Sequence, residues 1–224
     1  MERVGVRRTA WGLVFVLLLT VLVFAAIRLA VDVPNVMSGT TPDPSAFEHR
    51  YARYPWLAYA HILPGVGYLL LAPIQLWRGF RNRHLRWHRR IGRMTLALGL
   101  TSGVFAILFG FFQSFGGVLE ATAAVTFGLW FIACLVHAYR SIRRRDVHTH
   151  RRWMIRAFAV GLAVGTIRIW IGLFEATGVL SFRDAFGVAF WISFVMHAAA
   201  AELWLRWRPG ASGFVTASRG AASS

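Results

Sequence analysis

Long runs of apolar residues, separated by short polar stretches, dominate the chain. Six of these runs approach or exceed the roughly 20 residues that a helix needs to cross about 30 Å of hydrocarbon. The pattern therefore predicts an all-α integral membrane protein with six transmembrane helices. We place the spans at Thr9–Ala30, Pro55–Trp77, Met94–Phe112, Val118–Tyr139, Trp153–Phe174 and Ala185–Leu205.

One polar stretch, 31–54, is longer than the others, and we expect it to form an outer loop. Ser45 is expected to cap a short surface helix that continues to Tyr54. Three prolines are expected to break regular structure before it: Pro34, Pro42 and Pro44. The chain then divides into an N-terminal helix over 1–30, this loop, a five-helix membrane domain over 55–205 and a disordered tail over 206–224.

Two of the turns between runs resemble each other. The second and third runs are joined through His-Arg-Arg beginning at His88, and the fourth and fifth through His-Arg-Arg beginning at His150. Each motif is followed by a further arginine, Arg93 or Arg156, where the next run begins. The repeat predicts a four-helix core made of two similar hairpins, with the first and sixth helices as flanks.

Composition supports a membrane location and argues against nucleic-acid binding and against an intramolecular disulfide. The chain is 57% hydrophobic with a formal net charge of +16, and all 25 of its basic residues are arginine. In a soluble protein this charge would suggest nucleic acid, but here the arginines lie between apolar runs. We therefore expect them to contact the anionic headgroups of a lipid bilayer, and not nucleic acid. The single cysteine, Cys134, excludes an intramolecular disulfide.

The distribution of arginine predicts the orientation. Twenty arginines lie at the N-terminus, in the second and fourth turns and in the tail, whereas Arg28, Arg50, Arg53 and Arg183 lie on the opposite side. Because arginine-rich segments stay in the cytoplasm, both termini are predicted to be cytoplasmic, in an inner (plasma) membrane.

Two polar residues within the predicted spans are candidates for a ligand site. His61 lies about two turns below the outer face of the second span, and Arg168 lies at a similar depth in the fifth, on a face rich in glycine. An arginine at this depth costs about 2.5–3.5 kcal/mol on insertion scales, so a partner is expected. The candidate partners are Glu175, Glu120, Gln113, Tyr59 and a bound anion. A structural ion pair and a ligand-binding role both stay open.

Four further histidines allow a b-type haem, because facing helices of a bundle can each supply one axial histidine. An inner haem would use His88 with His150, or His137 with either. An outer haem would pair His61 with His197, whose predicted depths differ by roughly 7–8 Å. Proton relay or quinone contact through His61 and Arg168 is an alternative. The histidines can also be interfacial residues, or core residues held by hydrogen bonds, that bind no cofactor.

Metal binding by the inner histidines is disfavoured, because flanking arginines would repel a cation. The sequence thus indicates no metal site, and whether the protein is an enzyme, and through which residues, stays open. No Gly-rich phosphate loop, zinc-binding His-Glu-x-x-His helix or nucleophile elbow occurs.

Three stretches together resemble a bacterial family of predicted membrane proteins, domain of unknown function 2306. They are Pro55–Gly65, Trp87–Arg93 and His150–Arg156, the last continuing to Arg168. The resemblance covers roughly Pro55 to Trp204 and implies a multi-pass helical membrane protein without implying an activity. Carried over by position, it draws attention to His61, His88, His150, Arg156 and Arg168. The core is also loosely similar to two-haem b-type cytochromes, without their two level histidine pairs.

Three functions are therefore left open. The first hypothesis is a redox-related protein that binds b-type haem or quinone around His61, His88, His150 and Arg168. The second is a haem-free transporter or small-ligand-binding protein with an outward cavity at His61 and Arg168. The third is a structural or assembly factor in which the polar residues only hold helices together.

Overall fold

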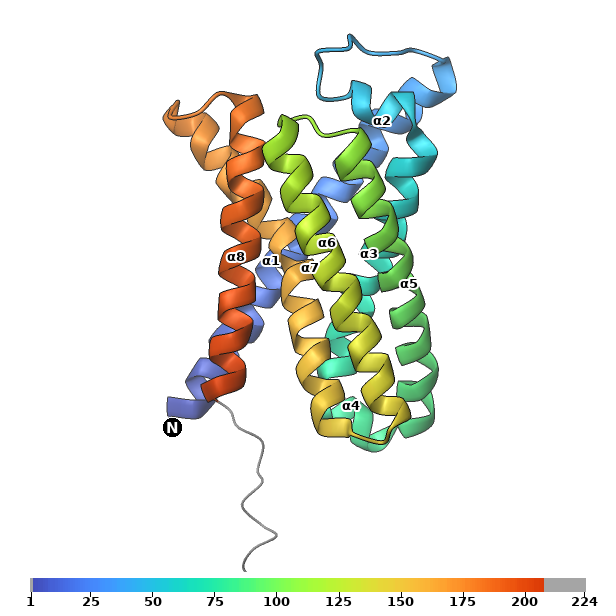
Figure 1. Ribbon diagram of the computed structural model, residues 1–224, viewed down its shortest axis with the longest axis vertical. Helices are drawn as coiled ribbons and strands as arrows, with labels where there is room; N and C mark the ends of the chain where they lie inside the picture. The colour runs from blue at the N-terminus through green and yellow to red at the C-terminus, as the bar shows by residue number, and fades with distance from the viewer. Residues whose placement is uncertain (1, 208–224) are drawn as a thin grey trace, which may run out of the picture.

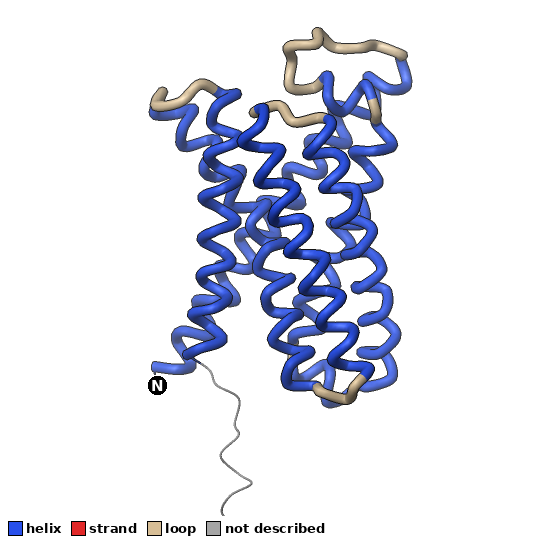
Figure 2. The backbone as a smooth tube through the Cα atoms, viewed as in Figure 1, coloured by secondary structure: helices blue, strands red, loops and turns tan. Residues whose placement is uncertain are grey.

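The computed structural model describes residues 2–207, which form eight helices and, within that range, no strand (Figures 1 and 2). Six of them are long and apolar enough to span a membrane, which confirms the predicted fold class. The helices are α1 (Glu2–Ser38), α2 (His49–Arg53), α3 (Pro55–Leu76), α4 (Arg78–Arg83), α5 (Leu85–Phe112), α6 (Gly117–Arg143), α7 (Val147–Thr177) and α8 (Phe182–Trp207).

Several helices extend beyond the apolar runs that predicted them. α5 begins at Leu85, well before Met94, and α7 begins at Val147, before Trp153. These extra turns carry arginines, which are good helix formers and whose long side chains keep the charge near the headgroups while the backbone stays helical.

The bundle is built around the two predicted hairpins. α3, α5, α6 and α7 pack against one another in sequence, and α7 also contacts α3 and so closes the group. α8 packs along α6 and α7, whereas α1 crosses diagonally behind the bundle and contacts α7 and α3 (Figure 1). The four-helix core with flanking first and last helices is therefore present.

The outer loop differs from its prediction at both ends. α1 passes through Pro34 and ends at Ser38, so Pro34 does not break the structure. The hydrogen bond that Tyr59 of α3 donates to Asp32 fixes α1 two residues before this proline. Ser45 does not cap a helix, because its hydroxyl group and backbone N–H both bond to Asp43, and α2 begins only at His49.

The arginine-rich turns lie at one end of the bundle. α4 and the α6–α7 turn lie together there, as does the N-terminal end of α1, whereas the loop between α1 and α2 lies at the other end (Figure 1). This segregation is what the positive-inside rule requires of a single orientation. The orientation itself stays a prediction, and the tail expected to be disordered lies, from residue 208 onward, outside the described residues.

Candidate functional site

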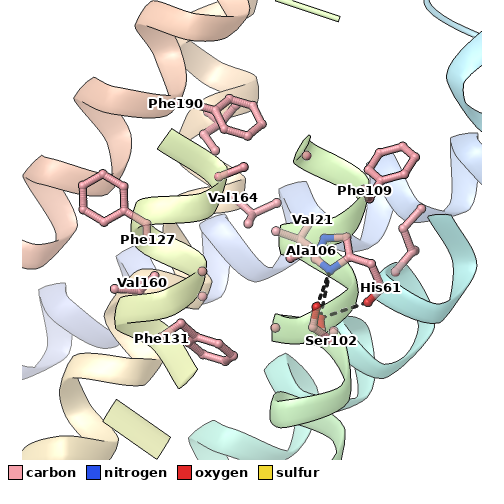
Figure 3. Close-up of a pocket in the computed structure, with 18 of the residues that line it drawn as sticks. Val21, His61, Ser102, Ala106, Phe109, Phe127, Phe131, Val160, Val164 and Phe190 are labelled. Atoms are coloured by element: carbon pink, nitrogen blue, oxygen red, sulfur yellow. Dashed lines mark hydrogen bonds between the residues drawn. The ribbon is translucent and has the colours of Figure 1, made fainter. Parts of the chain in front are cut away.

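A cavity of about 200 Å³ lies inside the bundle, in the half nearer the α1–α2 loop. All six long helices contribute to its wall, and most of the lining is aromatic or aliphatic. Figure 3 shows His61 and Ser102 on one side of the view and Phe127, Phe131 and Phe190 on the other. A few polar side chains lie within this apolar wall, the arrangement usual for small-molecule sites.

His61 is held in one orientation by α5. Its Nδ1 lies 3.0 Å from the carbonyl oxygen of Ser102, and the Ser102 hydroxyl group donates a hydrogen bond of 3.0 Å to the His61 carbonyl oxygen (Figure 3). A Cβ on Gly65 would lie 2.8 Å from the Ser102 hydroxyl oxygen, so glycine one turn after His61 leaves room for this contact. Because Nδ1–H donates to a carbonyl, Nε2 of the neutral ring is the nitrogen with a free lone pair.

Arg168 of α7 also lines the cavity. Its Nε is buried without a hydrogen-bond partner, and no carboxylate among residues 2–207 lies within ion-pair distance of its guanidinium group. The guanidinium carbon lies 5.5 Å from the centre of the Phe24 ring of α1. A cation–π contact of this kind offsets only part of the free energy that a buried charge loses on leaving water.

A second arginine in the same wall has a carboxylate partner, although its Nε, like that of Arg168, is buried without a hydrogen-bond partner. Arg50 of α2 donates a hydrogen bond of 3.0 Å to Glu120 of α6, whose other carboxylate oxygen accepts the Gly116 N–H at 2.7 Å. The Glu120 side chain is 0% exposed and that of Arg50 is 9% exposed. Three aromatic rings surround the Arg50 guanidinium group, with Phe109 the nearest at 4.6 Å.

A third arginine fastens α1 to the rest of the protein. Arg28 lies 3.6 Å from both Asp32 of its own helix and Glu48 of the loop. Tyr59 of α3 donates a hydrogen bond of 3.1 Å to Asp32, whose side chain is only 2% exposed. We call these four residues the α1 latch: Arg28, Asp32, Glu48 and Tyr59.

The structure brings together some of the predicted ligand-site residues and separates others. His61, Arg168 and Glu120 line one cavity, but Glu120 is the partner of Arg50 and not of Arg168. Tyr59 belongs to the α1 latch, and Glu175 is exposed near the end of α7, so neither of them lines the cavity. The partner expected for Arg168 is thus not supplied by any of the predicted carboxylates.

The remaining histidines are dispersed. His197 of α8 lies 2.8 Å from the Thr166 hydroxyl oxygen and does not line the cavity, so it does not share a site with His61. His137 is exposed and stacks on Trp153, with ring centres 4.8 Å apart.

His88 and His150 lie close enough for their charges to interact, at the arginine-rich end. The Nδ1 of His150 lies 2.9 Å from the carbonyl oxygen of Ala138, whereas the Nδ1 of His88 is buried without a partner. Arg156 forms two hydrogen bonds with Glu202 of α8, of 2.5 and 3.0 Å. Within residues 2–207, no group of three or more His, Cys, Asp or Glu side chains is arranged to hold a metal ion.

Sequence reasoning missed three residues of the site: Arg50, Ser102 and Phe24. Arg50 lies outside every predicted span. It is buried because it belongs to the short helix α2, from which its side chain reaches α6. Ser102 lies beside Gly99 and Gly103 on α5, where close packing could have suggested a contact with α3. Phe24 has no distinguishing signal in an apolar run.

The model of one protein family, described as Predicted membrane protein (DUF2306), matches residues 58–205. The match covers more than half of the chain, which therefore belongs to this family, as the resemblance predicted. Comparisons with curated proteins and with solved structures gave no match.

Proposed function

We propose that this membrane protein is a haem-free protein that binds a small ligand in the cavity beside His61 and Arg168. The observation that carries the proposal is the Arg168 side chain, which lines an apolar cavity with a buried, unpartnered Nε and has no described carboxylate within ion-pair distance. A buried charge without a partner is retained where something outside the polypeptide compensates it. A ligand with an acidic or hydrogen-bonding group meets that requirement.

His61 supports the same role. Its Nδ1 is fixed by α5, which leaves Nε2 available to a ligand in the cavity. The arrangement is that of a rigid polar group on a preformed wall.

The stability of the unliganded protein tests the proposal. Arg168→Met removes an uncompensated charge, so the melting temperature of protein purified in detergent should rise, by roughly 5 °C. Arg50→Met should lower it, because Glu120 is left buried and unpaired. A fall in Arg168→Met as large as that in Arg50→Met would mean that Arg168 is structural, which would contradict ligand binding here.

The inner histidines favour a second candidate function, a redox protein with b-type haem. His88 and His150 come from α5 and α7, and the Nδ1 of His150 meets a backbone carbonyl as in many metal-ligating histidines. A reduced-minus-oxidised spectrum of protein made with ample haem tests it. The bands should disappear in His88→Ala and His150→Ala and persist in His137→Ala, and their absence from the wild type would reject this function.

A further inference from the structure

One arginine of the cavity wall lacks a carboxylate partner. Arg28 faces Asp32 and Glu48, and Arg50 is bonded to Glu120. Arg168 alone among the arginines of the wall has no carboxylate within ion-pair distance among the side chains that the structure describes. A ligand with a negatively charged group would give Arg168 the partner that it lacks, whereas a neutral ligand would leave the guanidinium group without one.

The planar shape of the Arg168 guanidinium group favours one kind of acidic group on the ligand. A carboxylate matches its planar fork and can accept two parallel N–H groups. Nε2 of His61 can in addition accept a hydrogen bond from the acid in its neutral form. His61 and Arg168 line the same cavity, so both side chains are available to a headgroup bound there.

The rest of the wall suits an alkyl chain. Rings of Phe109, Phe127 and Phe131 and aliphatic side chains make up most of the surface. The volume of about 200 Å³ is below the roughly 300–1,000 Å³ of common ligand pockets. A headgroup and the first part of one chain would fill this space, and the remainder of the chain would have to leave the cavity toward lipid.

α1 offers a route to lipid, because it forms one wall and is attached to its neighbours at two places. At Gly165 of α7, a Cβ would lie only 2.8 Å from the backbone oxygen of Leu17, which marks a close crossing of the two helices. About three turns farther along α1, the latch holds Arg28. Between these attachments the wall consists of Val21, Phe24 and Ala25.

Phe24 stands at the boundary between the cavity and the bilayer. Its side chain lines the cavity, lies over the Arg168 guanidinium group and is nevertheless 40% exposed. A ring that the protein does not fully enclose thus lies over the guanidinium group. Movement of α1 about its crossing with Gly165 would open the cavity sideways.

From these observations we infer that the ligand is a single-chain alkyl carboxylate, taken laterally from the leaflet on the α1–α2 loop side past α1. The inference rests on the proposed ligand-binding function and specifies its ligand class and route. Arg168 binds the headgroup, His61 accepts a hydrogen bond from it when the acid is neutral, and the α1 latch sets how readily the wall opens.

Competition binding tests the ligand class. The full chain in phosphatidylcholine nanodiscs is loaded with the fluorescent fatty acid cis-parinaric acid, which is then displaced by dodecanoate, dodecanol, dodecylamine or dodecyl phosphate. Dodecanoate should displace the probe at a concentration at least tenfold lower than the alcohol or the amine. Arg168→Gln should abolish this preference and Arg168→Lys should retain part of it, whereas Arg53→Gln, on the same side of the protein but exposed, should leave it unchanged.

A reversible cross-link tests the route. Asp32→Cys and Tyr59→Cys in a Cys134→Ala background are joined by a short bis-methanethiosulfonate, which replaces the Asp32–Tyr59 hydrogen bond by a covalent tether. Uptake of cis-parinarate from vesicles, followed by stopped-flow fluorescence, should slow at least tenfold and recover when the tether is reduced. An unchanged uptake rate would overturn lateral uptake past α1.

The outcomes separate this inference from the proposed function. Equal displacement by acid, alcohol and amine, or preferential displacement by the dianionic dodecyl phosphate, would overturn the ligand class. Failure of any probe to bind, together with a stabilising Arg168→Met, would overturn the inference alone. The same failure with a destabilising Arg168→Met would overturn both.

Discussion

Arg50 and Arg168 line the same cavity, but their surroundings differ in one respect. Arg50 meets a carboxylate that no solvent reaches, and three aromatic rings enclose the pair. Arg168 meets one ring of a helix that packs loosely against the bundle, and no carboxylate. The protein thus supplies a partner for one buried guanidinium group and omits it for the other. The difference teaches that arginine in a membrane bundle is not in itself a sign of either stability or function; the presence or absence of a carboxylate partner separates the two cases.

The largest effect should come from separating the complete pair. Arg50→Met or Glu120→Gln alone should destabilise the protein by about 3–5 kcal/mol, because the remaining partner stays buried without compensation. The double variant Arg50→Met/Glu120→Leu should recover most of this loss, since no isolated charge remains. Melting temperatures in one detergent measure all three. If the double variant were as unstable as either single one, packing and not charge would account for the loss.

The fold could be predicted well from the sequence because its cause is local. A run such as Ala185–Leu205 is apolar over its whole length, and in lipid a backbone of that kind has to satisfy its hydrogen bonds as a helix. The same reasoning located the two hairpins from their arginine-rich turns. It failed at Pro34, where α1 continues to Ser38, and at Ser45, which does not cap a helix.

The candidate site could be predicted only in part. His61 and Arg168 stand out because polar residues are rare within spans, and the structure places both in one cavity. The pairing of Glu120 could not be inferred, because Arg50 reaches it from a short helix seventy positions away. The depth of a carboxylate along its own helix does not reveal which of several arginines arrives beside it.

A smaller effect should follow from disturbing the cover over Arg168. Gly165→Ala would place a Cβ 2.8 Å from the backbone oxygen of Leu17, so α1 has to move away, at a cost of about 1–3 kcal/mol. Gly172→Ala on the same helix is the matched control, because no atom lies within 4 Å of its added Cβ. Melting temperatures of the two variants should therefore diverge. Equal values would mean that α1 yields at this crossing without loss.

The contact between Phe24 and Arg168 should contribute less again. Phe24→Leu keeps an apolar side chain but removes the cation–π contact, worth about 0.5–1 kcal/mol at a partly exposed site. Phe15→Leu, on the same helix and 67% exposed, is the control for loss of a lipid-facing ring. A double-mutant cycle with Arg168→Met isolates the contact. A coupling energy of zero would show that the ring covers the charge without stabilising it.

The smallest effect is expected at Asp146, an exposed acid whose partner is the backbone and which therefore lies outside the contrast between Arg50 and Arg168. Its carboxylate accepts the Thr149 N–H at 2.9 Å and begins α7, and this hydrogen bonding holds the pKa of Asp146 below its ordinary value of 3.8. Because the folded-state pKa is depressed, the contribution to stability is complete above about pH 4 and is lost as the pH falls through the folded value. Asp146→Asn keeps an acceptor oxygen and removes the charge, so its melting temperature should depend less on pH than that of the wild type between pH 5 and pH 3.

High salt should also reduce the contribution of the Asp146 charge to the stability of the wild type, since an exposed charge is screened, whereas salt should leave the effect of Arg50→Met unchanged. If high salt altered the effects of Asp146→Asn and Arg50→Met equally, solvent would reach the Arg50–Glu120 pair. The contrast between the paired Arg50 and the unpaired Arg168 would then fail.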